Sequence, residues 1–171
     1  NSDAVQSLAL AGTANIGGTQ LTEAVAADVQ RVLLSPATRD VVRKKAALTL
    51  LRLYRIDETV IDLEESAGPL IGLLEQKNIG VRIAVVSLLL NMVSSSTQYL
   101  EDCVPRCIMC LTQLVIHKAC PSDYLYYNTA CPWLQVKLLR MLQYFPLPTD
   151  STLVGRLNEV LERILTRTEV T

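Results

Sequence analysis

Apolar residues recur at helical spacing along most of the chain, and the best bounded example runs from Pro132 to Pro146. A proline suits the first turn of a helix but cannot continue one, so Pro132 marks the start and Pro146 the stop. The apolar positions between them form one broad face that we expect to be buried: Leu134, Leu138, Leu139, Met141, Leu142 and Phe145. The polar positions are expected to face solvent: Gln135, Lys137, Arg140 and Gln143.

The same periodicity predicts about eight helices in all, joined by short turns. The other seven segments are Ala4 to Ala14, Thr19 to Ser35-Pro36, Asp40 to Arg55, Pro69 to Leu74, Val81 to Met92, Cys103 to His117, and Leu153 to Leu165. We expect a Gly17-Gly18 turn after the first segment, Thr19 as the N-cap of the second, a break at Ser35-Pro36, and Pro69 in the first turn of its helix. In the segment from Asp40 to Arg55, the residues expected to point inward are Val42, Ala46, Ala47, Leu50, Leu51 and Tyr54. No segment is typical of a β-strand, so the predicted fold class is all-α.

Three of these segments share a phrase in which an aliphatic-basic pair is followed eight residues later by two bulky apolar residues. The copies are Val42-Arg43 with Leu50-Leu51, Val81-Arg82 with Leu89-Leu90, and Val136-Lys137 with Tyr144-Phe145. The first two starts lie 39 residues apart (42 to 81), close to the ~40–47-residue period of HEAT and armadillo repeats. The third follows after 55 residues (81 to 136), and we interpret residues 118–131, a Tyr-rich loop, as an insertion between repeats. The pattern predicts that residues 1–171 form one helical-repeat segment, an α-solenoid; the alternative is an irregular helical bundle.

Composition adds limits rather than a function. Half of the 171 residues are hydrophobic and the formal net charge is −1, so no global charge attracts nucleic acid or an anionic membrane. The five cysteines, an odd number set mostly in helical patterns, indicate reduced thiols and an intracellular protein. The chain lacks an initiating Met and opens on an amphipathic pattern, so we expect a fragment of a longer protein.

The candidate chemistry is sparse. Cys103, Cys107 and Cys110 share one helix face with His117 further along, but four zinc ligands must converge on one point, and these spread along a helix axis. A nucleophilic pair of Cys110 and His117 would place the two side chains two turns apart, too far for a hydrogen bond. Buried thiols are the simpler interpretation. There is no Gly-rich phosphate loop, and we predict no cofactor, metal or small-molecule substrate.

Two surfaces remain as candidates for binding. Arg39, Arg43, Lys44 and Lys45, continued by Arg52 and Arg55, form the densest basic patch, and we name the first four as a partner-contact surface. It would suit an acidic partner or phosphoinositide headgroups, or it is the solvated face of one helix, partly paired with neighbouring acids. The aromatic group of Tyr124, Tyr126, Tyr127 and Trp133 either binds a peptide or pins the long loop onto the solenoid, which we favour.

Several phrases resemble one protein family. AALTLLRLYR over 46–55, Asp123-Tyr124 with Tyr126-Tyr127, PWL and VKLLR over 132–140, and Gly155-Arg156-Leu157 are similar to the trunk of the alpha-adaptins, large subunits of the plasma-membrane clathrin adaptor complex. The resemblance covers about residues 8 to 165. It implies a right-handed α-solenoid of HEAT/armadillo-like repeats in the N-terminal half of the trunk. The family's phosphoinositide-binding basic residues and its part of the dileucine-cargo site lie mostly before the matched segment, so no binding residue is carried over.

The resemblance further implies a non-enzymatic scaffold that assembles with beta, mu and sigma adaptin subunits. Through the parent protein it would join a clathrin coat on phosphoinositide-rich membrane, at the cytosolic face of the plasma membrane, in clathrin-mediated endocytosis. No nucleic acid is implied as a partner. Two alternatives stay open: a HEAT/armadillo module of another vesicle-coat or signalling scaffold, and a cysteine hydrolase or zinc enzyme that uses the face from Cys103 to His117.

Overall fold

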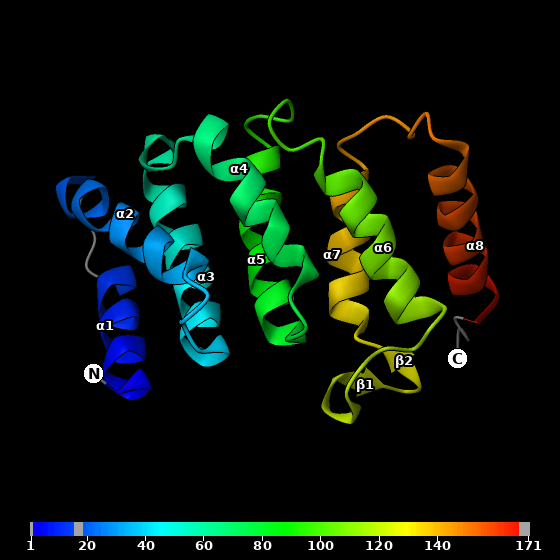
Figure 1. Cartoon of the computed structure of the whole chain (residues 1–171), viewed down its shortest axis with the longest axis horizontal. Helices are drawn as coiled ribbons and strands as arrows, with labels where there is room; N and C mark the ends of the chain where they lie inside the picture. The colour runs from blue at the N-terminus through cyan, green and yellow to red at the C-terminus, as the bar shows by residue number, and fades with distance from the viewer. Residues whose placement is uncertain (1, 16–18, 168–171) are drawn as a thin grey trace. The chain divides into compact units, whose positions relative to one another are not determined.

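The computed structural model describes residues 2–15 and 19–167, and these form eight α-helices, three short 3-10 helices and one two-stranded hairpin (Figure 1). The chain divides into two compact units, Asn1–Leu100 and Glu101–Thr171. The first holds α1 Asp3–Asn15, α2 Thr19–Leu34, α3 Asp40–Ile56, η1 Glu58–Val60, α4 Leu63–Gly72, η2 Leu73–Glu75 and α5 Ile79–Val93. The second holds α6 Cys103–Val115, η3 Ser122–Tyr124, β1 Leu125–Tyr126, β2 Thr129–Ala130, α7 Pro132–Leu142 and α8 Ser151–Arg167. The predicted Gly17-Gly18 turn and the side chain of Thr19 lie outside what the structure describes.

The helix α3 is the centre of the first unit, because α1, α2 and α5 all pack against it. The six positions predicted to point inward, from Val42 to Tyr54, are all buried, so that prediction is confirmed. The hydroxyl of Thr49 donates a hydrogen bond to the main-chain oxygen of Leu10, 3.1 Å away, which ties α1 to α3. On α2 the buried positions are Thr22, Ala26, Val29 and Leu33.

The helix α5 is apolar on nearly all sides. Val86 and Val93 are buried on other faces than the main buried stripe, which consists of Val81, Ala84, Val85, Leu88, Leu89 and Met92. A helix that is apolar all round belongs in the interior, where neighbours cover every side. It ends at Val93, one residue beyond the predicted Met92 and just before a serine cluster, Ser94-Ser95-Ser96.

The helix α4 begins earlier than its sequence pattern suggested. The Asp62 carboxylate accepts hydrogen bonds from the main-chain N–H groups of Glu64 and Glu65, at 2.9 and 3.4 Å. This cap starts the helix at Leu63. Pro69 therefore lies inside the helix, not in its first turn, and the prediction for Pro69 was wrong.

In the second unit α6 packs against both α7 and α8. Pro105 lies in the first turn of α6, where its missing N–H costs no helical hydrogen bond. The inner side of α7 carries Leu134, Leu138 and Met141, which are fully buried, whereas Leu139, Leu142 and Phe145 are only half-buried. The helix α8 buries fewer residues than α6 or α7 do, and these are Leu157 and Val160.

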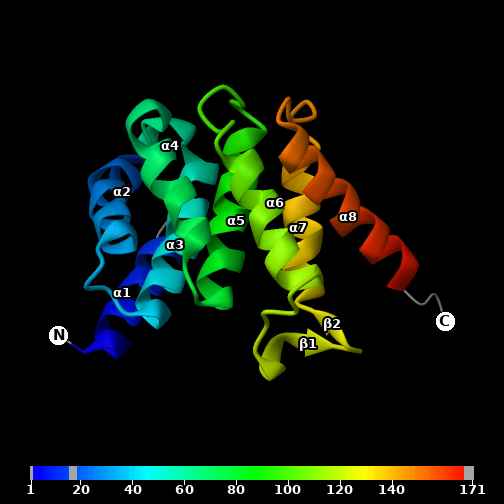
Figure 2. The ribbon, with the colours of Figure 1, turned by 45° about the vertical axis from the view of Figure 1, so that its right-hand side comes forward.

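The loop over residues 118–131 contains a small antiparallel hairpin beside the ends of α6 and α7 (Figure 2). Leu125 pairs with Ala130 and Tyr126 with Thr129, which leaves Tyr127-Asn128 as a two-residue turn. The prediction of no strand was thus wrong here. Strands of two residues show too little alternation for a sequence pattern to reveal them.

Candidate functional site

The predicted basic surface divides between exposed cations and one buried arginine. Arg39, Lys44 and Lys45 are exposed on and just before α3. The Arg39 guanidinium pairs with the Asp3 carboxylate at 2.6 Å, and an exposed pair of this kind contributes little stability. Lys44 and Lys45 make no ion pair or side-chain hydrogen bond to another described residue.

The exposed side of α3 is not purely basic. Val41 and Leu48 are about half exposed on the same side as Lys45 and Arg52, since these positions follow one another at helical spacing. Further along, the Arg55 side chain donates through Nε to Asn91 Oδ1 at 2.8 Å. The result is a surface that interleaves cations with aliphatic side chains. We call it the α3 stripe, and it comprises Arg39, Val41, Lys44, Lys45, Leu48, Arg52 and Arg55.

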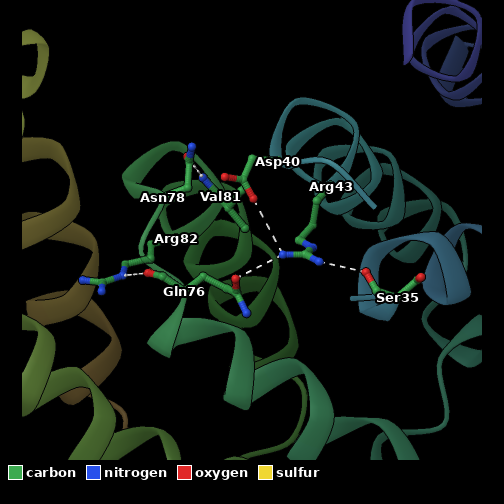
Figure 3. Close-up of polar contacts among 7 residues, drawn as sticks. All are labelled: Ser35, Asp40, Arg43, Gln76, Asn78, Val81 and Arg82. Carbon is green, nitrogen blue, oxygen red and sulfur yellow. Dashed lines mark hydrogen bonds and ion pairs between the residues drawn. The ribbon is translucent and has the colours of Figure 1, made fainter. Parts of the chain in front are cut away.

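Arg43 lies beneath this surface and is only 6% exposed. Its guanidinium donates through Nη2 to the main-chain oxygen of Ser35 at 2.8 Å and through Nη1 to Gln76 Oε1 at 3.1 Å. The Asp40 carboxylate lies 3.7 Å from Nη1, whereas Nε has no hydrogen-bond partner. Arg43 therefore joins the loop before α3 to the loop before α5, and it is not available as a surface contact (Figure 3).

A second buried arginine reaches the same loop. Arg82, in the first turn of α5, donates through Nε to the main-chain oxygen of Gln76. Figure 3 shows Gln76 between the two guanidinium groups, one bound to its side chain and the other to its main chain. Next to it, Asn78 Oδ1 accepts from the main-chain N–H of Val81 at 3.1 Å and caps α5. The loop over 76–78 is thus fixed from both flanking repeats.

The arginines explain the repeated phrase and correct its third copy. In α3 and α5 a fully buried valine precedes a buried arginine that bonds back to the loop before its helix. In α7 the corresponding residue is Gln135, which follows the fully buried Leu134 and donates to the main-chain oxygen of Ala130 at 2.6 Å. The predicted third copy at Val136 is 56% exposed. The repeat is therefore shifted by two residues, and the expectation that Gln135 faces solvent was wrong.

The three helical cysteines are buried side chains, as predicted. Burial raises the pKa of the Cys103 thiol to about 12, although the nearby Arg106 opposes the shift. Burial also raises the pKa of Cys107 well above its usual value. His117 is exposed beyond the end of α6, apart from the buried Cys110. Within the described part of the chain, no three His, Cys, Asp or Glu side chains are grouped as a metal ion requires.

The aromatic group forms a surface cluster. Tyr126 makes edge-to-face contacts with Tyr127 and Trp133, with ring centroids 4.6 and 5.5 Å apart, so one ring links the hairpin to α7. All three rings remain mostly exposed. The residues of the loop that point inward are instead small, since Ala130 and Cys131 are buried. Within the loop, the Cys131 N–H donates to the main-chain oxygen of Tyr124 at 2.9 Å. The expectation that aromatic side chains hold the loop down was therefore right only for the Tyr126 contact.

Comparison with known proteins gives the chain a family. The family described as adaptin N terminal region matches residues 1–169. The chain belongs to the adaptin family. Helical repeats of the HEAT type make up this region, so the predicted all-α fold is confirmed.

Individual relatives refine the comparison. This adaptin segment is 42% identical to the AP-2 complex subunit alpha-1 of Arabidopsis thaliana over 96% of its length, and 36% identical to the AP-2 complex subunit alpha of Schizosaccharomyces pombe over 93%. It is 25% identical to the AP-1 complex subunit gamma-like 2 of Mus musculus over 96%. The segment spans only 16% and 18% of the two AP-2 subunits. None of the helices formed by its described residues is long and apolar enough to cross a membrane.

Proposed function

We propose that this adaptin segment is part of the trunk of an AP-2-type alpha subunit and serves there as a non-enzymatic scaffold. The parent protein would assemble with beta, mu and sigma subunits and support cargo selection in clathrin-mediated endocytosis at the cytosolic face of the plasma membrane. The observation that carries this proposal is the match to AP-2 alpha subunits at 36–42% identity over nearly the whole segment, against 25% for the AP-1 gamma-type relative.

The packing of the first unit supports a scaffold role. In a repeat array each repeat contacts only its neighbours, so the stability of the array depends on how well each repeat is fixed to the next one. Here Arg43 holds two successive loops with two charge-assisted hydrogen bonds, and Arg82 holds the second loop again. The buried polar groups thus stiffen the connections between repeats rather than serve catalysis.

We further propose that the α3 stripe contacts a partner, with Arg39, Lys44 and Lys45 as its cations and Arg43 as the support beneath. Lys44 and Lys45 have no partner within the described residues, and aliphatic side chains lie next to Lys45. A protein surface that interleaves cations with apolar side chains fits an acidic, partly apolar protein surface better than a purely ionic one. Within an assembled adaptor, a neighbouring subunit would supply that surface.

Co-purification tests the proposal. The full-length parent, co-expressed with beta, mu and sigma subunits from its own species, should be recovered with the AP-2 set. The Lys44→Glu/Lys45→Glu variant should be recovered with less of the beta, mu and sigma subunits than the wild type. A Lys77→Glu/Arg140→Glu control places the same charge change on other exposed positions and should behave as the wild type. Recovery of the wild type with AP-1 subunits alone would contradict the AP-2 proposal. If both variants recovered the AP-2 subunits as well as the wild type does, the proposed partner contact of the α3 stripe would be refuted, but the scaffold role would not.

A further inference from the structure

The second unit contains a cavity of about 600 Å³ that its packing leaves open. Four parts of the unit line it: the end of α6 with Lys118, the hairpin turn, the start of α7, and the end of α8. A cavity of this size lies within the range typical of small-ligand and peptide sites. It is separate from the α3 stripe, which belongs to the other unit.

The charge of the lining is one-sided. Lys118, Arg163 and Arg167 contribute three cations, and none of the residues described by the structure adds an Asp or Glu to the lining. Helix C-termini favour cations, which accounts for each position, and two such ends converge here. Glu159 and Glu162 share a neighbouring cleft with the two arginines, but no ion pair forms between them in the described part of the chain.

The hairpin turn places an exposed aromatic ring at the edge of this cavity. Tyr127 and Asn128 both have positive φ, 43° and 62°, as a type I′ turn requires. Asn suits such a position, whereas the Cβ of Tyr makes it unfavourable. The Tyr127 side chain is nevertheless 88% exposed and lines the cavity. The fold therefore holds an aromatic ring in solvent at a backbone position that disfavours it, and such strain is typical of functional positions.

The remaining lining combines apolar and hydrogen-bonding groups. Val115 and Ile164 supply aliphatic surface, while Asn128 and Thr129 add an amide and a hydroxyl. A bare phosphate would use the cations alone and leave the aromatic and aliphatic walls empty. Leu114 and Ala130 line the cavity and are buried, so a flat membrane surface would contact its rim and not these inner walls. A short peptide that carries both carboxylates and an apolar side chain uses every part of the lining.

We propose that this cavity binds an acidic peptide segment of a partner protein. Arg163 and Arg167 hold its carboxylates from one wall and Lys118 from another, and Tyr127 packs on an aromatic or aliphatic side chain of the peptide. This site goes beyond the proposed scaffold role and does not depend on it.

Fluorescence anisotropy with the 171-residue chain tests the proposal. The probe is a short fluorescein-labelled peptide of Asp and Glu residues with one central Phe. The Arg163→Gln/Arg167→Gln variant should bind it about tenfold more weakly, because two charge contacts are lost, one from the half-buried Arg163 and one from the exposed Arg167. The matched control is Arg140→Gln/Arg156→Gln, which removes two exposed cations of the same unit outside the cavity and should bind as the wild type does. Binding should also weaken as salt rises.

A second variant tests the role of the Tyr127 ring in binding independently of any effect on folding. Tyr127→Asn removes the exposed ring contact with Tyr126 but suits the positive φ better than tyrosine does. Because these two effects offset each other, the variant should melt close to the wild type and yet bind the peptide more weakly. Unchanged affinity in either cavity variant, or no binding of the peptide at millimolar concentration, overturns the proposal. Full displacement by inorganic phosphate, or equal binding of a peptide with Ser in place of Phe, would show a simple anion site and overturn it as well. Binding to phosphatidylcholine–phosphatidylserine vesicles through Arg163 and Arg167, with no peptide binding, would assign a membrane instead.

Discussion

Arg43→Met removes the bridge between the loops before α3 and α5 while it keeps a long side chain in the same space. Two hydrogen bonds are lost, to the Ser35 oxygen and to Gln76 Oε1. A hydrogen bond to a charged group contributes about 1.5–3 kcal/mol, and both acceptors are only half-buried, so the low end applies. Methionine also avoids burying a guanidinium whose Nε has no partner. The net loss in the free energy of unfolding should be about 2 kcal/mol.

Urea denaturation followed by two signals measures this loss. The only tryptophan, Trp133, lies in the second unit, so its fluorescence reports that unit, whereas far-ultraviolet circular dichroism reports both units. The Arg43→Met change should shift the transition seen by circular dichroism. In thermal melts the same loss corresponds to about 10 °C for a unit of this size. A simultaneous shift of the Trp133 signal would show that the two units unfold together.

Two further variants give the result its meaning. Lys44→Met makes the same chemical change at an exposed neighbour and should alter stability by less than about 0.5 kcal/mol. Arg43→Lys keeps the charge but loses the forked geometry that spans two acceptors, so it should recover only part of the loss. If Arg43→Met were as stable as the wild type, the bridge would not hold the two loops, and the stiffness argument for the scaffold would fail.

Three other outcomes follow from the second unit. Leu138→Asp should unfold it or make it aggregate, because a carboxylate replaces a fully buried side chain, whereas Val136→Asp on the exposed side should stay soluble with a cooperative melt. Gln135→Ala should cost about 1–2 kcal/mol in chemical denaturation, since it leaves a carbonyl of the hairpin without its donor; a silent change would contradict the buried contact. The pKa of Cys103, raised to about 12 by burial against about 8.5 in an unfolded chain, means that stability is retained below pH 8.5 and falls as pH rises towards 12. In native protein at pH 8, Cys120 should react with a thiol reagent before Cys103 does, and rapid modification of Cys103 would contradict its burial.

Much of the fold could be predicted from the sequence because helix packing leaves a periodic record. The inward face of α3 and the buried positions of α5 follow a spacing that only one helix orientation satisfies. The turns that end α2 and α5 are marked by Ser35-Pro36 and by the serine cluster. The family could also be recognised from the sequence, because the phrases that resemble it lie in helices with a clear hydrophobic pattern.

The start of α4 and the shift in α7 were not predictable in this way. The position of Pro69 favoured a first turn, but the Asp62 cap starts the helix earlier. In α7 a basic residue was expected after the aliphatic one, whereas the fold uses Gln135 for the same bond. A glutamine amide donates to a carbonyl as an arginine does, so the repeat is kept in its contacts and not in its residue type.

By itself, the sequence determined the helices, the aliphatic core and the adaptin family, since each depends on periodic or contiguous residues. Only the tertiary structure decided which polar side chains are buried. Arg43 and Lys44 look equivalent in a pattern, yet one bridges two loops and the other lies in solvent. The cavity likewise depends on Lys118 and Arg163, far apart in sequence, being brought together by α6 and α8. Periodicity records which side of a helix faces the core, but the partner of a polar atom depends on segments that periodicity does not relate.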